Sequence, residues 1–135
     1  MKAMTYLDTN IFVYAAINNG ELGNRCRKKL SEIAKSDLKF YTSSLTWDEL
    51  VYAIWKKEGK DKAIVEGSLF LQLPNISFLI INQIIIAKAQ NLTEVYNLKP
   101  RDAIHAATAI INNIKEIISD NPDFDKIKEI KRIKI

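Results

Sequence analysis

The 135 residues, 47% of them hydrophobic and 27% charged, have the size and composition of one globular domain, so we expect a single domain over residues 1–135. The single cysteine excludes an internal disulfide and a Cys-rich zinc site, and the absence of a secretory signal or of an apolar run near the ~18 residues of a membrane span favours a cytoplasmic protein. The net charge of +4 suits a polyanion such as nucleic acid without requiring one.

The first half of the chain alternates short strand-like runs with helical patterns. Apolar residues such as Leu22, Cys26 and Leu30 recur at a spacing of four, which indicates an amphipathic helix. Gly20 belongs to a turn, and Gly59 is a plausible helix stop. In chain order we predict a strand over 3–7, helices over 10–17 and 22–36, a strand over 38–42 and a helix over 46–58.

Two prolines mark helix boundaries in the second half. Pro74 ends one helix, and Pro100 suits the first position of another because its missing N–H would have no helical partner there. In chain order we predict a helix over 61–72, a strand over 76–80, helices over 82–96 and 100–113, and strands over 116–119 and 130–134. Strands that alternate with helices predict the α/β class with a parallel sheet.

Four acidic residues stand where this fold class places active sites. Asp8 and Asp120 directly follow the first and fourth predicted strands, while Glu49 and Asp102 lie in the first turns of two helices. Because active sites of such sheets lie beyond the carboxyl ends of the strands, we expect the four acids to converge. Converging carboxylates repel one another, and Mg²⁺ or Mn²⁺, which prefer oxygen ligands, would relieve that repulsion.

A metal site of this kind predicts hydrolysis of a phosphodiester. A metal-bound water loses its proton more easily, and the metal shields the negative charge of the phosphate from an incoming hydroxide. The chain has a single histidine and no serine or cysteine triad pattern, so the sequence offers no covalent alternative.

Each acid also has a purely structural interpretation. Asp8 could cap the helix that follows it, and Asp102 could complement the positive end of its helix dipole. Glu49 stands three residues after Thr46 in a capping-box pattern, Thr-x-x-Glu. The functional hypothesis therefore depends on all the acids lying together at one edge of the sheet.

Other side chains near these acids have two interpretations each. His105 lies one turn after Asp102, and a packing or hydrogen-bonding role is favoured over that of a metal ligand or base. Trp47, Tyr52 and Trp55 share one helix, where bases could stack, although packing in the core or against a partner is favoured.

Four segments together resemble a known family. They read Leu-Asp-Thr-Asn-Ile, Ser-x-x-Thr-x-x-Glu-Leu, Arg-Asp-Ala-Ile-His-Ala-Ala and Ile-Ile-Ser-Asp-Asn-Pro-Asp-Phe-Asp. In this order and at this spacing they resemble the PIN domain, and in particular the VapC-type toxins of toxin–antitoxin pairs. The resemblance implies a three-layer α/β/α sandwich around a central parallel sheet and Mg²⁺- or Mn²⁺-dependent cleavage of RNA. It also implies frequent homodimerisation and, for the toxins, inhibition by a cognate antitoxin.

The resemblance assigns roles to residues of this chain. Catalytic roles fall to Asp8, Glu49, Asp102 and Asp120, metal binding to the same four acids and Asp123, and supporting roles to Thr9, Asn10 and Ser119. The fourth acid stays open, because many relatives carry Thr-x-Asp-x-Asp-Phe and the central position here is Asn121. Asp120 or Asp123 could serve in its place, and both could instead form the turn around Pro122.

Three functions fit these observations. The leading one is an endoribonuclease toxin held inactive by an antitoxin. The second is an RNA-processing nuclease of the same fold without an antitoxin. The third is an RNA-binding module in which catalysis is weakened, as the missing fourth acid would suggest.

Overall fold

The computed structural model describes residues 3–135, and within them a five-stranded parallel sheet has the order β3-β2-β1-β4-β5. Its strands are β1 (Met4–Leu7), β2 (Lys39–Ser43), β3 (Ile76–Leu79), β4 (Glu116–Ile118) and β5 (Lys131–Ile133). All neighbouring strands run parallel, so their carboxyl ends meet at one edge of the sheet. The predicted parallel sheet is confirmed.

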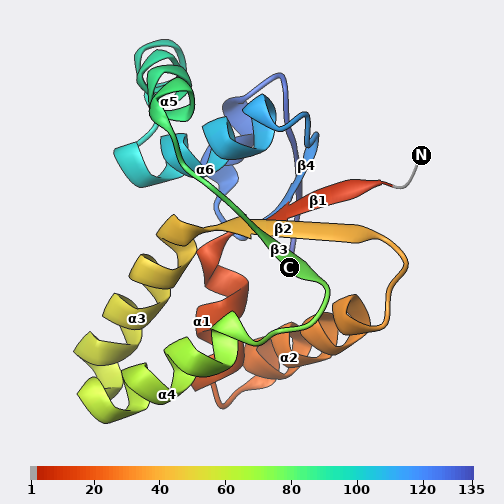
Figure 1. The fold of residues 1–135 in the computed structure, drawn as a ribbon, viewed down its shortest axis with the longest axis vertical. Coiled ribbons are helices and arrows are strands. Elements are labelled where there is room, and N and C mark those ends of the chain that lie inside the picture. The colour runs from red at the N-terminus through yellow and green to blue at the C-terminus, as the bar shows by residue number, and fades with distance from the viewer. Residues whose placement is uncertain (1–2) are drawn as a thin grey trace.

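Helices cover both faces of this sheet, which confirms the three-layer α/β/α sandwich (Figure 1). One face carries α1 (Thr9–Ile17), α2 (Glu21–Ala34), α3 (Ser44–Glu58) and α4 (Lys60–Leu71), and the other carries α5 (Gln83–Tyr96) and α6 (Pro100–Ile111). Among residues 3–135, no helix has both the length and the apolar character needed to cross a membrane.

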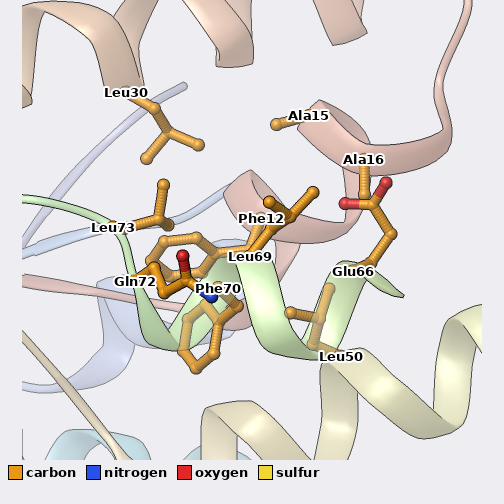
Figure 2. Close-up of a pocket in the computed structure, with 10 residues that line it drawn as sticks. All are labelled: Phe12, Ala15, Ala16, Leu30, Leu50, Glu66, Leu69, Phe70, Gln72 and Leu73. Atoms are coloured by element: carbon orange, nitrogen blue, oxygen red, sulfur yellow. The ribbon is translucent and has the colours of Figure 1, made fainter. Parts of the chain in front are cut away.

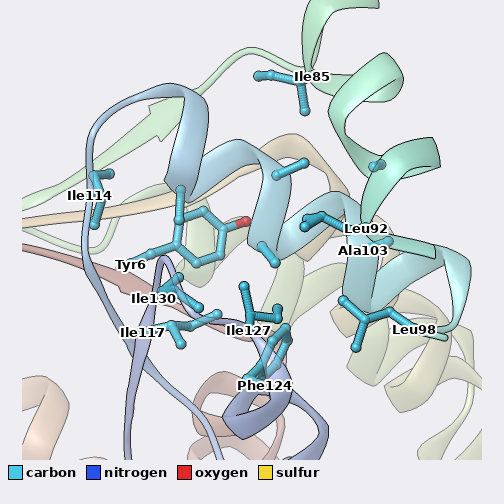
Figure 3. Close-up of a cluster of buried hydrophobic side chains, with 14 residues drawn as sticks. Tyr6, Ile85, Leu92, Leu98, Ala103, Ile114, Ile117, Phe124, Ile127 and Ile130 are labelled. Atoms are coloured by element: carbon cyan, nitrogen blue, oxygen red, sulfur yellow. The ribbon is translucent and has the colours of Figure 1, made fainter. Parts of the chain in front are cut away.

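Side-chain alternation along the strands builds a separate core on each face. Tyr6 and Ile117 point toward α5 and α6, whereas their neighbours Leu7 and Ile118 point toward the helices of the other face. Figure 3 shows the first of these cores, in which the Tyr6 ring lies among apolar side chains of α5, α6 and the last quarter of the chain. Because β1 is central, the residue that follows it is enclosed from both sides.

The predicted elements agree with the observed ones, with boundaries that differ by at most two residues. One difference affects the site, because α3 begins at Ser44, with Ser43 as its N-cap, rather than at Thr46. Another is a short 3-10 helix at Pro122–Lys126, where the sequence indicated only a turn.

Gly59 joins α3 to α4 and lets the two helices fold back on each other. Its φ of 92° lies in the region that only glycine adopts freely, and its backbone N–H donates to the carbonyl of Trp55. The predicted stop at Gly59 is therefore confirmed. The resulting hairpin fixes the direction of α3, whose first turns carry Glu49.

Candidate active site

A pocket of about 330 Å³ opens at the carboxyl edge of the sheet. Three carboxylates from distant parts of the chain line it, those of Asp8, Glu49 and Asp102. Thr9 and Asn10 from the start of α1 line it as well. The structure therefore brings together three of the acids that the sequence selected, as the carboxyl-edge rule anticipates.

Asp8 is held rigidly at the junction of β1 and α1. Its Oδ1 accepts a 2.8 Å hydrogen bond from the Thr9 N–H, and its Oδ2 accepts one of 2.7 Å from the Ser119 hydroxyl. Its backbone N–H continues the ladder to the carbonyl of Ile118, and only 5% of the residue is exposed. Asp8 thus caps α1 and also lines the pocket, so the two interpretations of this residue are compatible.

Glu49 reaches across the pocket and does not cap its own helix. Its Oε1 accepts a 2.8 Å hydrogen bond from the Thr9 hydroxyl and also bonds the Nε2 of His105. The hydroxyl of Thr46 is occupied elsewhere, since it accepts a 2.7 Å hydrogen bond from Thr42. The capping-box interpretation of Glu49 is therefore wrong, because α3 starts two residues before Thr46 and its N-cap is Ser43.

His105 is 1% exposed and contacts these carboxylates from inside the protein, without lining the pocket itself. The Tyr6 hydroxyl donates to Ser43 Oγ at 2.8 Å, so its oxygen is left to accept from His105 Nδ1 at 2.7 Å. The opposite ring nitrogen, Nε2, bonds Glu49 and lies 3.5 Å from Asp8 Oδ1. With an acceptor at each nitrogen, the ring suits the doubly protonated form.

Electrostatics agree with a protonated His105. Burial lowers its pKa, but its contacts with Tyr6, Glu49 and Asp8 outweigh burial and raise the pKa to about 10. A protonated imidazole has no lone pair for a metal, so His105 serves as a fixed cation within the acidic site. The hydrogen-bonding role that the sequence favoured fits this arrangement.

The charges of the carboxylates are compensated unequally. Burial raises the pKa of Glu49, but the contacts with His105, Thr9 and Arg101 outweigh it and leave that pKa lowered. Burial and then the nearby charge of Asp8 raise the pKa of Asp102. Negative charge at Asp8 and Asp102 is therefore only partly neutralised by the protein, which favours a bound cation there.

Asn121 occupies the place where the resemblance would expect a fourth acid. It lines the pocket, and its Nδ2 donates to Asp102 Oδ2 at 3.0 Å. Its side-chain oxygen, Oδ1, accepts a 3.0 Å hydrogen bond from the Asp123 N–H, and its backbone N–H donates to Ser119 Oγ at 3.0 Å. Asn121 thus shapes the turn after β4 and orients Asp102.

Asp120 and Asp123 are not among the residues that line this pocket in the described part of the chain. Asp120 lies near α1 and α2. Burial is the first cause that raises the pKa of Tyr14 in α1 and of Cys26 in α2, and the negative charge of Asp120 is the second. Asp123 lies 3.5 Å from the Lys126 ammonium in the 3-10 helix. A metal-binding or catalytic role for either residue remains a prediction.

Sequence reasoning missed two basic residues of the pocket, Lys56 and Arg101. A signal for both was present, since Lys56 lies two turns after Glu49 on the same face of α3 and Arg101 immediately precedes Asp102.

The sequence also favoured packing in the core or against a partner for the aromatic residues of α3. Trp47, Tyr52 and Trp55 are 42%, 55% and 49% exposed, so the interpretation that they pack in the core is wrong.

The donor set of the pocket suits a hard divalent cation. Among residues 3–135, no three His, Cys, Asp or Glu side chains are close enough to enclose a metal ion by themselves. Mg²⁺ does not need such an enclosure, because it typically binds one or two carboxylates and keeps several waters. The oxygen ligands of Asp8 and Asp102, with the only nearby imidazole protonated, fit Mg²⁺ or Mn²⁺ better than a softer metal.

The chain matches one protein-family model and is similar in structure to several solved proteins. The family model described as PIN domain matches residues 5–130. No curated protein sequence matches the chain. Among solved structures, the chain is similar to the Mycobacterium tuberculosis VapC20 toxin, a Sarcin-Ricin loop cleaving toxin, with a TM-score of 0.77 and 11% identity over 93% of this chain and 96% of that one.

Two further solved structures share the fold. VapBC2 from Rickettsia felis, bound to a DNA fragment from its promoter, gives a TM-score of 0.76 and 22% identity, covering 97% of this chain and 98% of that one. FitAcB from Neisseria gonorrhoeae gives a TM-score of 0.68 and 20% identity, covering 96% of each chain. At these identities the similarity shows a common fold over nearly the whole length.

Proposed function

This chain belongs to the PIN domain family, and from that premise we propose that it is a divalent-metal-dependent endoribonuclease that hydrolyses RNA phosphodiester bonds. The observation that carries the proposal is the pocket lined by Asp8, Glu49 and Asp102. Its oxygen donors and its incompletely compensated negative charge support a site for Mg²⁺ or Mn²⁺. When bound, such an ion acidifies a water ligand and neutralises charge on the phosphodiester.

The residues of the chain have separate tasks in this site. Asp8 and Asp102 would hold the ion, oriented by the Ser119 hydroxyl and the Asn121 amide respectively. Glu49 would complete the site from the opposite wall, where the bond from His105 keeps it ionised. The test is RNA cleavage by the purified protein with added Mn²⁺ or Mg²⁺ and with a chelator, and the decisive variant is the replacement of Asp8.

We further propose that the protein is the toxin of a type II toxin–antitoxin pair. VapC20, whose fold it shares, is a toxin that cleaves the Sarcin-Ricin loop, and a further structure with this fold is a toxin–antitoxin complex from Klebsiella pneumoniae. Growth arrest on overexpression, relieved by a protein encoded in a neighbouring short reading frame, would support this role. Unimpaired growth together with RNA cleavage in vitro would favour an RNA-processing nuclease, and RNA binding without Mn²⁺ binding would favour a non-catalytic module.

A candidate binding site for the antitoxin lies on the side of α1 that faces away from the acidic pocket. Figure 2 shows an apolar groove of about 440 Å³ between helices of one face, with Phe12, Leu30, Leu69 and Phe70 among its walls. Leu69 is 52% exposed and adjoins the other apolar side chains of the groove, and contiguous apolar surface of this kind commonly marks a site that a partner covers. The groove therefore supports a partner that inserts an apolar segment.

We expect Leu69→Lys to preserve toxicity but to abolish rescue by the antitoxin. The side chain is exposed, so a lysine should leave the fold and the acidic pocket intact while placing a charge in the groove. Val65→Lys is the matched control, because Val65 is 55% exposed on the same helix and does not line the groove. Growth curves with and without the antitoxin measure both effects, and full rescue of the Leu69 variant would exclude the groove.

A homodimer, which the resemblance implies, is also part of the proposal. Trp47 and Trp55 remain about half exposed on α3, and Phe78 on the edge strand β3 is 39% exposed. Trp47 and Phe78 line one shallow apolar pocket, and a second copy would cover this surface.

A further inference from the structure

The pocket that holds the carboxylates has a second wall of different chemistry. Tyr52 and Lys56 line it from α3, and Arg101 lines it from the start of α6. Glu49, Tyr52 and Lys56 are spaced by three and four residues, so one face of α3 presents an acid, an aromatic ring and a cation in succession. None of the three residues of this wall is needed to hold a metal ion.

The cations of this wall are available for a ligand. Within residues 3–135, the ion pairs join other residues and leave Lys56 and Arg101 without a carboxylate partner. Arg101 nevertheless lies close enough to the carboxylates for its charge to help lower the pKa of Glu49. A polyanion that approaches three carboxylates needs positive charge beside them, and these two side chains supply it.

Tyr52 is not part of the core, and its exposed ring is available for stacking against a base. It is 55% exposed, and the Lys56 ammonium lies 5.3 Å from the centroid of its ring. In a nucleotide the base and the phosphate also lie close together. The Tyr52 ring could therefore contact the base while the Lys56 ammonium contacts the phosphate. Bases stack on aromatic side chains, and guanidinium groups bind phosphate through two parallel hydrogen bonds.

We propose that Tyr52, Lys56 and Arg101 bind one unpaired nucleotide of the RNA beside the scissile phosphate, with its base on Tyr52 and its flanking phosphates on Lys56 and Arg101. This inference rests on the proposed function and adds the part of the substrate that the acids cannot recognise. A base within a duplex is stacked on its neighbours and cannot reach the Tyr52 ring. The wall therefore selects single-stranded or looped RNA over duplex RNA.

The test measures binding without cleavage. The Asp8→Asn protein, in chelator, is titrated into a short fluorescent RNA of mixed, unstructured sequence, and the dissociation constant is followed by anisotropy at several salt concentrations. On this background Tyr52→Ala should weaken binding about 5- to 100-fold with little change in salt dependence, because stacking is lost and no charge is removed. Tyr52→Phe keeps the ring and should bind within about twofold of the parent.

Removal of the charges should give the opposite pattern. Lys56→Gln and Arg101→Gln should each reduce the slope of log K against log salt by about 0.7, as expected for one phosphate contact to a single strand. Lys35→Gln removes the same charge from an exposed lysine beyond the C-terminus of α2, away from the pocket, and should leave the slope unchanged. The same RNA annealed into a duplex should compete poorly.

In the binding experiment, two results would overturn the inference. One is equal binding by Tyr52→Ala and Tyr52→Phe, and the other is a salt slope that Lys35→Gln lowers as much as the two pocket variants do. Failure of the proposed function looks different, since RNA binding would then follow this pattern while the wild-type protein with Mn²⁺ leaves RNA intact. Conversely, if the wild-type protein cleaves RNA and the variants of Tyr52, Lys56 and Arg101 have an unaltered KM, the nuclease function would be supported and the nucleotide site refuted.

Discussion

Asp8→Asn is expected to lower the rate of metal-dependent RNA cleavage at least about a hundredfold, which corresponds to a loss of about 3 kcal/mol of transition-state stabilisation. The substitution removes the negative charge of a buried residue, 5% exposed, that lines the pocket. It keeps the shape of the side chain, and asparagine still accepts the Thr9 N–H bond of the helix cap. The effect should therefore fall on metal binding and catalysis rather than on folding.

Two measurements separate these effects. Cleavage of RNA is compared with and without Mn²⁺, and the rise of Tm on addition of Mn²⁺ reports binding independently of activity. Asp37→Asn is the matched control, because Asp37 is an exposed aspartate in the loop before β2, at the amino edge of the sheet. An Asp8 variant that cuts RNA as well as the wild type would refute the proposed mechanism.

The second large effect concerns the stability that His105 contributes. We expect His105→Gln to reduce the free energy of unfolding by about 3 kcal/mol, because the loss of the buried cation leaves the carboxylate of Glu49, whose side chain is only 20% exposed, without its partner. The imidazole is 1% exposed and bonds both Glu49 and Tyr6, so a neutral amide cannot replace its charge or span both acceptors. Urea unfolding of the metal-free protein measures the change.

A double-variant cycle tests whether the loss comes from the pair. Glu49→Gln and His105→Gln should each destabilise, while the double variant should recover about 1–3 kcal/mol relative to the sum of the two, since neither charge is then left alone. Glu129→Gln removes the exposed partner of Lys88 and should change the unfolding free energy far less. Strict additivity of the Glu49 and His105 variants would show that their contact contributes no coupling.

Much of the fold was predictable because its signals are local. Local patterns of apolar residues and turn residues located the α-helices and strands, and Pro100 and Gly59 marked helix boundaries through the geometry of their own backbones. Asp8 was predictable in the same way, since a residue that directly follows a strand of a parallel sheet must lie at its carboxyl edge. The short 3-10 helix at Pro122–Lys126 escaped, because a turn of proline and aspartates has the same composition.

The orientation of Glu49 was beyond the reach of local patterns. A Thr-x-x-Glu motif predicts a capping box equally well, and only the start of α3 at Ser44 and the nearby position of α6 decide against it. The contacts that hold Glu49 join residues 40 and 56 positions away along the chain, Thr9 and His105 respectively. Such contacts depend on how α1, α3 and α6 pack around the end of β1.

The amino-acid sequence was sufficient to predict the α/β class, the order of helices and strands, and the set of acidic residues that are candidates for the site. Only the three-dimensional structure shows that Asp8, Glu49 and Asp102 share one pocket, that Asn121 lies beside Asp102, and that the buried His105 ring contacts Asp8 and Glu49. The two sets of features differ in how far apart along the chain the interacting residues are. Backbone propensities and caps act within about four residues, whereas charge compensation and pocket shape are set by side chains that meet only when the sheet and both helical layers have assembled.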